Sequence, residues 1–93
     1  YAATVHAAAS GTVTFAGETP GYGKTVVVTH RFGFQTRYAH LTLIYTRKGA
    51  EVEKGDVIGF VGSTGISTGN HLHYEVIKNQ KRINPLNFIY GTK

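Results

Sequence analysis

The chain has 93 residues, 41% of them hydrophobic and 16% charged, which suits one compact domain with a small apolar core. Its net charge of +5 would attract nucleic acid, anionic lipid or acidic cell-wall polymers, but the basic residues are scattered, which favours a solvated surface over a nucleic-acid site. Cysteine is absent, so disulfides and thiolate metal sites are excluded and any metal must bind histidine or carboxylate. No apolar run approaches the ~20 residues that span a bilayer.

Short alternating segments separated by glycine clusters predict an antiparallel β meander or sandwich, without long amphipathic helices. In chain order, strands are expected within residues 9–16, 24–30, 34–41, 51–61 and 71–78, with turns at 17–23, 31–33 and 54–56. Asn84 is expected to cap a single helical turn that begins at Pro85 and ends near Phe88, because asparagine suits the N-cap and proline the first helical position. The fold class is therefore mainly β, a small antiparallel sheet or sandwich with one short C-terminal helical turn.

The strand expected at residues 34–41 contains the first candidate site residues. By the period of two, Thr36, Tyr38 and His40 share one face of this strand. The pattern therefore predicts that Tyr38 and His40 lie side by side.

Two histidines begin the last expected strand. His71 and His73 are two residues apart, so both imidazoles project from one face, roughly 6 to 7 Å apart at the backbone. They suit one metal ligand with a neighbouring base, or two ligands of one ion, and an exposed polar face is an equal alternative. With His40 on a neighbouring strand, three histidines can converge on one groove. There a metal would lower the pKa of bound water toward ~7, a neutral histidine would accept the proton, and a histidinium or tyrosine would stabilise the oxyanion.

The remaining polar candidates favour simpler roles. Glu75 shares the predicted face of His71 and His73 and can orient an imidazole from behind, although balancing surface charge is the favoured interpretation. His30, at a strand end, is expected to be structural or exposed. His6 carries no information about function.

At this point the chain resembles the lysostaphin-type (LytM-like) zinc endopeptidases, the peptidoglycan hydrolases. The resemblance covers nearly the whole chain in matching order and spacing, and takes in Val5 to Val13 and Asn84-Pro85. Its motifs are Gly21-Tyr22-Gly23, Tyr38-Ala39-His40-Leu41, Lys54-Gly55-Asp56-Val57-Ile58-Gly59, Gly62-Ser63-Thr64-Gly65, Ser67-Thr68-Gly69 and His71-Leu72-His73-Tyr74-Glu75.

The resemblance implies a small antiparallel β fold with a groove and a zinc-dependent enzyme. Its substrate would be the peptide cross-links of bacterial peptidoglycan, outside the cell or in its envelope. By resemblance His73 is a zinc ligand, His40 and His71 are the catalytic histidines, and Tyr38 lines the substrate groove. Anionic cell-wall polymers are further candidate partners, and no nucleic acid or membrane span is expected.

One departure from the family concerns the metal. The family's first motif, a His followed four residues later by an Asp, should precede the segment that Val5 to Ala8 resembles, and it is missing. His6 cannot replace it, because the residue four positions later is Ser10. With His73 as one of three expected protein ligands, we expect residues 1–93 to be a single domain that lacks its N-terminal ligand segment and is inactive alone.

Two other functions are kept as alternatives. The first is a non-catalytic relative that binds cell-wall peptides or regulates another hydrolase, consistent with the missing ligand pair. The second is a biotinyl- or lipoyl-like carrier or a sugar-binding β domain, because such folds also have a turn like the one around Lys54. Lys54 lacks the flanking methionine that is usual in carriers, so this interpretation is the weaker one.

Overall fold

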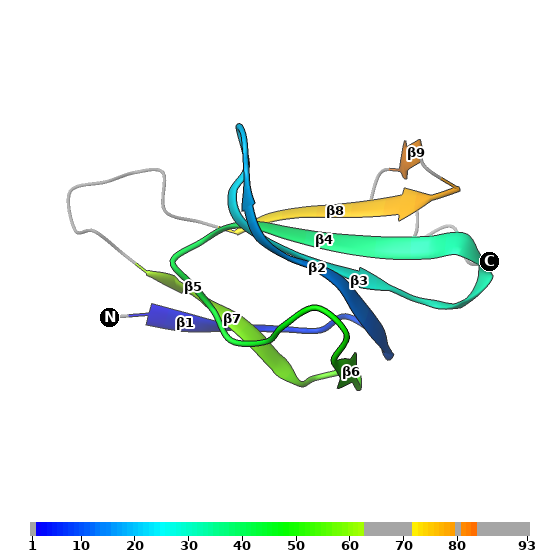
Figure 1. Cartoon of the computed structure of the whole chain (residues 1–93), viewed down its shortest axis with the longest axis horizontal. Helices are drawn as coiled ribbons and strands as arrows, with labels where there is room; N and C mark the ends of the chain where they lie inside the picture. Colours follow the sequence, from blue (N-terminus) through cyan, green and yellow to red (C-terminus); the bar gives the residue numbers. More distant parts are fainter. Residues whose placement is uncertain (1, 63–71, 80, 84–93) are drawn as a thin grey trace.

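The computed structural model describes residues 2–62, 72–79 and 81–83, and these form two antiparallel β-sheets (Figure 1). The larger sheet has six strands in the order β6-β2-β3-β4-β8-β9, and the smaller has three in the order β1-β7-β5. The strands are β1 Ala2–His6, β2 Gly11–Thr19, β3 Gly23–Thr29, β4 Phe34–Leu41, β5 Leu43–Ile44, β6 Glu51–Val52, β7 Val57–Gly62, β8 His73–Lys78 and β9 Lys81–Ile83.

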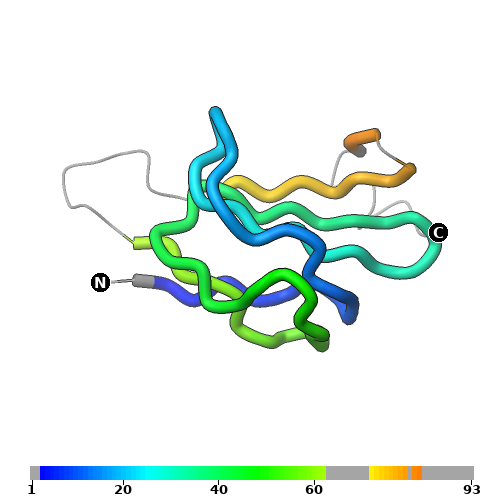
Figure 2. The backbone as a smooth tube through the Cα atoms, in the orientation of Figure 1, coloured from blue at the N-terminus to red at the C-terminus, as the bar shows by residue number. Residues whose placement is uncertain are grey.

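The chain passes between the two sheets five times in sequence order, and the tube of Figure 2 shows the passage from β4 to β5. Strands β2, β3 and β4 form two successive hairpins, and β8 adds antiparallel to the free side of β4. This central part of the larger sheet is the region that positions the candidate site.

The core lies between the two sheets and is built mainly of β-branched side chains. Val13, Val26 and Val28 of the larger sheet are at most 1% exposed, and Ile58 of the smaller sheet is fully buried. Such residues pack well on pleated surfaces. Tyr38 is the largest of the fully buried side chains among the described residues.

Two bulges interrupt the regular alternation of the larger sheet. The pairing of β2 with β3 shifts between Val13 and Phe15, which leaves Phe15 on the outer face, 38% exposed. In the pairing of β3 with β4, Val26 lies opposite Tyr38 and Lys24 lies opposite Leu41. One residue of β3 separates Lys24 from Val26, whereas two residues of β4 separate Tyr38 from Leu41, so β4 contains one extra residue there. A bulge of this kind turns the side chains that follow it to the opposite face.

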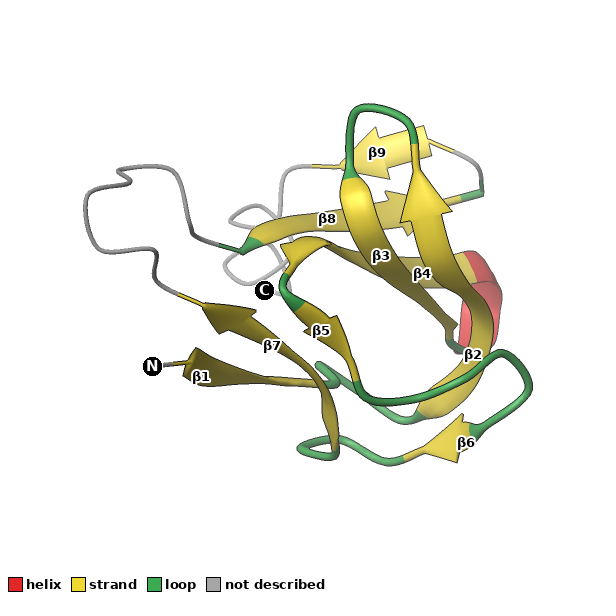
Figure 3. Ribbon diagram, turned by 60° about the vertical axis from the view of Figure 1, so that its left-hand side comes forward, coloured by secondary structure: helices red, strands yellow, loops and turns green. Residues whose placement is uncertain are grey.

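The predicted fold class is confirmed: the described chain is mainly β, with one three-residue 3-10 turn, Arg31–Gly33 (Figure 3). The strand predicted at residues 34–41 has the observed bounds, whereas β1, β5 and β9 were not predicted. The predicted C-terminal turn at residues 84–88 lies outside the described residues. Within the described ranges, no helix has the length and hydropathy needed to cross a bilayer.

Candidate metal and catalytic site

The outer face of the larger sheet carries the site residues of β4 and β8. The register pairs Arg37 with Glu75 and Ala39 with His73. Because neighbours across an antiparallel pair share a face, His73, Glu75 and Arg37 all lie on the side away from the core. Tyr38, which pairs with Tyr74, lies on the core side.

His40 reaches this outer face because of the bulge in β4. Its backbone φ is 60°, a left-handed conformation that is uncommon for a residue other than glycine. The amide of His40 donates a hydrogen bond of 2.8 Å to the carbonyl of Tyr22, which holds the bulge against the β2–β3 turn. The predicted alternation is therefore wrong at His40: Tyr38 and Leu41 are both buried, and His40 between them is exposed.

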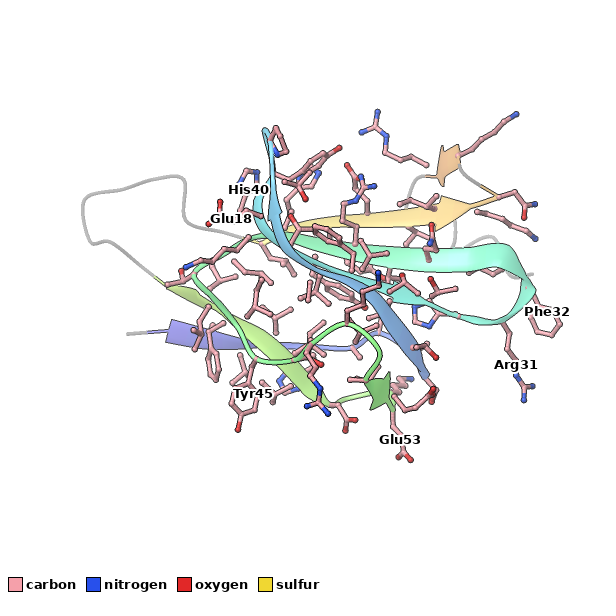
Figure 4. All side chains as sticks on the ribbon, viewed as in Figure 1. Glu18, Arg31, Phe32, His40, Tyr45 and Glu53 are labelled. Atoms are coloured by element: carbon pink, nitrogen blue, oxygen red, sulfur yellow. The ribbon has the colours of Figure 1, made fainter. Side chains whose placement is uncertain are left out.

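His40 and His73 meet on the outer face. Their ring centroids are 5.6 Å apart and the rings are nearly perpendicular, at 88°. Figure 4 shows His40 at the end of the larger sheet opposite to Phe32. The convergence predicted for His40 and His73 is thus observed, whereas His71, the other predicted catalytic histidine, lies outside the described residues.

A carboxylate holds one nitrogen of the His73 ring. Nε2 lies 2.8 Å from Oε2 of Glu75. Since an ionised carboxylate can only accept, Nε2 carries the proton and donates it. In a neutral ring Nδ1 would then be the nitrogen with a lone pair, and within the described part of the chain Nδ1 has no hydrogen-bond partner. The side chain of His73 is 41% exposed, so part of the ring is accessible to solvent.

Glu75 is buried and surrounded by donors. Besides His73, its oxygens accept hydrogen bonds from Nη1 of Arg37 at 2.6 Å, from Nη1 of Arg82 at 3.2 Å and from the hydroxyl of Tyr22 at 3.2 Å. Burial by itself raises the pKa of this carboxyl, but the bonds from His73, Arg37, Arg82 and Tyr22 together hold the pKa below its ordinary value. Glu75 is therefore ionised at neutral pH. This geometry supports the role of Glu75 as a hydrogen-bond partner of an imidazole. It does not support the interpretation favoured from the sequence, in which Glu75 balances surface charge.

Tyr22 lines the site from the β2–β3 turn. Its ring centroid lies 5.6 Å from that of His73, and the guanidinium of Arg37 stacks 4.8 Å above the Tyr22 ring. A cation at that distance from an aromatic face is attracted by the ring. The aromatic side chain beside the histidines is therefore that of Tyr22.

Tyr38, predicted to line the substrate groove, is 1% exposed in this structure. Its hydroxyl accepts a hydrogen bond of 2.9 Å from the amide of Ala8 and lies 2.7 Å from Oγ1 of Thr36. Burial raises the pKa of this hydroxyl. A substrate-binding role for Tyr38 stays a prediction, and these contacts support a structural role.

His30 has the structural role expected for it. Its Nδ1 lies 2.7 Å from the carbonyl oxygen of Ser10, and its Nε2 lies 2.7 Å from Oγ1 of Thr36. With both ring nitrogens bonded inside the protein, His30 has none left for a metal ion.

The residues on the outer face fit one part of a zinc site. A zinc-bound histidine usually donates its second ring N–H to a carboxylate, and Nε2 of His73 makes such a contact with Glu75. Zinc sites in enzymes need three protein ligands, and the described residues contain no group of three or more His, Cys, Asp or Glu side chains placed to bind a metal. Of the predicted metal ligands, the described segment contains His73, whose ring is hydrogen-bonded to the carboxylate of Glu75.

Sequence reasoning missed Tyr22, Arg37 and Arg82, which are distant along the chain from the His-x-His motif. Tyr22 stands inside the Gly-Tyr-Gly turn that the resemblance included. Arg37 could have been found only from the register of β4 on β8, which one sequence does not reveal.

Comparison with known proteins identifies the family. The model of Peptidase family M23 matches residues 1–85. The DD-carboxypeptidase/endopeptidase Mpg of Neisseria meningitidis is 49% identical over 88 residues, which are 95% of this chain and 20% of that protein. The peptidoglycan DD-endopeptidase ShyA of Vibrio cholerae is 39% identical over 82 residues, 88% of this chain and 19% of that protein. The chain thus spans about a fifth of the length of these relatives.

Solved structures agree with this assignment. A zinc-containing peptidase from Vibrio cholerae superimposes with a TM-score of 0.78 at 36% identity, covering 87% of this chain and 25% of that one. The SpoIIQ–SpoIIIAH pore-forming complex contains a chain with a TM-score of 0.84 at 38% identity, covering 95% of this chain and 57% of that one. The predicted lysostaphin-type family is confirmed, and the chain belongs to Peptidase family M23, a family of zinc-dependent peptidoglycan hydrolases.

Proposed function

We propose that the protein containing this chain is a zinc-dependent endopeptidase that cleaves peptide cross-links of bacterial peptidoglycan. The observation that supports this most directly is the pair of His40 and His73, with ring centroids 5.6 Å apart, on the outer face of an M23 fold. In this pair Nε2 of His73 contacts Glu75, and among the described residues Nδ1 has no hydrogen-bond partner. An imidazole that can bind a metal, beside a second, exposed imidazole that can exchange a proton, suits metal-assisted peptide hydrolysis.

In this proposal each site residue of the chain has its own role in hydrolysis. Bound zinc would lower the pKa of a coordinated water toward ~7 and polarise the peptide carbonyl. His73 would supply a ligand nitrogen, and Glu75, which is hydrogen-bonded to Nε2 of that ring, would hold the ring in place. His40, exposed beside His73, is within reach to accept the proton of the attacking water or, once protonated, to stabilise the developing oxyanion. The same pair of roles is proposed for His71 by its place in the family motif.

The substrate class rests on the relatives. ShyA acts as a peptidoglycan DD-endopeptidase, and Mpg as a DD-carboxypeptidase and endopeptidase. Peptidoglycan lies outside the cytoplasmic membrane, so the protein would act in the cell envelope or outside the cell. The net charge of +5 would favour binding to anionic wall polymers.

The remaining zinc ligands are proposed to come from residues outside these 93. A single imidazole does not bind zinc tightly, since enzyme sites use three protein ligands. A His-x-x-x-Asp motif in the longer protein, directly before Tyr1, would complete the set. Sequencing that region and finding no such motif would contradict this proposal.

Digestion of purified peptidoglycan by the longer protein tests the proposed function. Zinc content is measured first, and the released fragments are then analysed by mass spectrometry. We expect cross-linked fragments to be converted to uncross-linked ones, with activity lost on chelation and restored by zinc. A folded, zinc-loaded protein that leaves every cross-link intact would show that the function is not hydrolysis.

A non-catalytic role is the second candidate, favoured by the SpoIIQ–SpoIIIAH complex, which is described as pore-forming. A member of this fold can therefore take part in an assembly. His71→Ala separates the two candidates in cells that depend on the protein. An enzyme should lose its biological role with this substitution, whereas a binding module should keep it.

A further inference from the structure

Glu75 is the one buried charged side chain among the described residues, 6% exposed, and it has four donors around it. Burying a carboxylate is unfavourable unless hydrogen bonds replace its water. Arg37 occupies Oε1, while His73, Arg82 and Tyr22 share Oε2. The four donors come from three parts of the fold: the β2–β3 turn, β4 and the β8–β9 hairpin. A solvated charge on a sheet surface would not need such a set.

The hydrogen bonds around Glu75 determine the orientation of the His73 ring. Nε2 faces inward to Glu75 at 2.8 Å, and the ring packs between Tyr22 and His40, with both centroid distances 5.6 Å. The carboxylate thereby fixes which nitrogen bears the proton, and the two neighbouring rings limit rotation of the imidazole.

We propose that Glu75 is a positioning residue, which, held in place by Arg37, Arg82 and Tyr22, keeps the Nε2-protonated form of His73 and directs Nδ1 to the metal. This inference rests on the proposed function for the identity of the metal. It adds to that function an assignment of the coordinating nitrogen and a role for the three donors behind the carboxylate.

Glu75→Gln in the longer protein provides the first test, because it keeps the shape of the side chain and removes its charge. The zinc dissociation constant, measured by competition with a chelator, should rise about 10- to 100-fold, as expected for loss of a partner behind a metal ligand. Glu75→Asp, which restores the charge on a shorter side chain, should recover part of the affinity. Glu53→Gln is the matched control: Glu53 is exposed, and its substitution should leave zinc affinity unchanged.

A second test uses the metal-free protein and nitrogen NMR of the His73 ring. In the wild type we expect a proton on Nε2 with slow solvent exchange, and a bare Nδ1. Tyr22→Phe removes only the 3.2 Å hydrogen bond to Glu75 and should accelerate that exchange without unfolding the sheet. This variant keeps the proposal testable if Glu75→Gln does not fold.

The proposal is overturned if the wild-type ring carries its proton on Nδ1, or if folded Glu75→Gln binds zinc as tightly as the wild type. These outcomes are independent of hydrolysis. A wild-type protein that binds zinc but cleaves nothing would refute the proposed function alone, and the affinities of the variants would still decide the role of Glu75.

Discussion

Replacing Tyr38 by phenylalanine distinguishes a core role for this residue from a role in substrate binding. The substitution keeps the ring, which packs in the core and contacts Tyr74 at a centroid distance of 5.5 Å. It removes the hydroxyl that accepts from the amide of Ala8 and contacts Thr36. We expect a loss of stability with little change in catalysis.

The size of the loss follows from what the hydroxyl leaves behind. Thr36 keeps His30 as a hydrogen-bond partner, so its hydroxyl remains satisfied. The amide of Ala8 loses its acceptor, and the bond is part-buried. Leaving a part-buried backbone amide without its acceptor lowers the free energy of unfolding by about 1–2 kcal/mol. For a domain of this size, that loss lowers Tm by roughly 5–10 °C.

Urea unfolding measures the change in the free energy of unfolding, and native-state hydrogen exchange shows which backbone amide loses protection. The amide of Ala8 should exchange faster in Tyr38→Phe than in the wild type, beyond the change expected from global stability. Tyr45→Phe is the matched control, because Tyr45 is 64% exposed and its substitution should change stability by less than about 0.5 kcal/mol.

The opposite pattern would refute this reasoning. If Tyr38→Phe unfolds at the wild-type urea concentration and instead weakens binding of a wall peptide, the Tyr38 hydroxyl contacts substrate. The buried position of Tyr38 would then not be the one that this residue takes when substrate binds.

Three further predictions concern catalysis, packing and pH. His40→Ala should lower kcat by about 10²–10⁴-fold, the usual contribution of an acid–base group, with zinc content unchanged; unchanged kcat in steady-state assays would exclude His40 from the reaction. Gly11→Ala would place a methyl group against the carbonyl of Thr29, so overpacking should destabilise the chain by about 1–3 kcal/mol in urea unfolding; equal stability would mean that β2 can shift. Burial, and secondarily the charge of Tyr38, raises the pKa of Tyr74 from 10.0 to about 12. The folded state then holds the proton of the Tyr74 hydroxyl more tightly than the unfolded state does. The resulting contribution to the free energy of unfolding is present below pH 10 and is lost as the pH rises toward 12. The urea concentration at the unfolding midpoint should therefore fall over that pH range, and it should fall less steeply in Tyr74→Phe.

Much of the fold follows from local pattern. The β-branched run of β3 and the alternation in β4 specify two strands and the hairpin between them, and the strand predicted at residues 34–41 agrees in both bounds. Strands β5 and β9 were missed because two or three residues are too few to show a period. Strand β1 was missed because its Ala-rich sequence has low intrinsic preference for a strand.

The candidate site was only partly predictable from the sequence. The His-x-His spacing and the family motifs indicated His73 and His40 as partners, and the structure brings them together. The face on which His40 lies could not be deduced by counting residues, because the bulge in β4 reverses the alternation. That bulge depends on pairing with β3 and on the carbonyl of Tyr22, both distant in sequence.

The sequence by itself thus determined the β class, the main strands and the candidate histidines, since these depend on residue type and short-range spacing. Only the tertiary structure decided that Glu75 is a buried partner of His73 and that Tyr38 lies in the core. Burial and charge pairing are set jointly by segments far apart in the chain: Arg37, Arg82 and Tyr22 reach Glu75 from different elements. No local pattern contains that information.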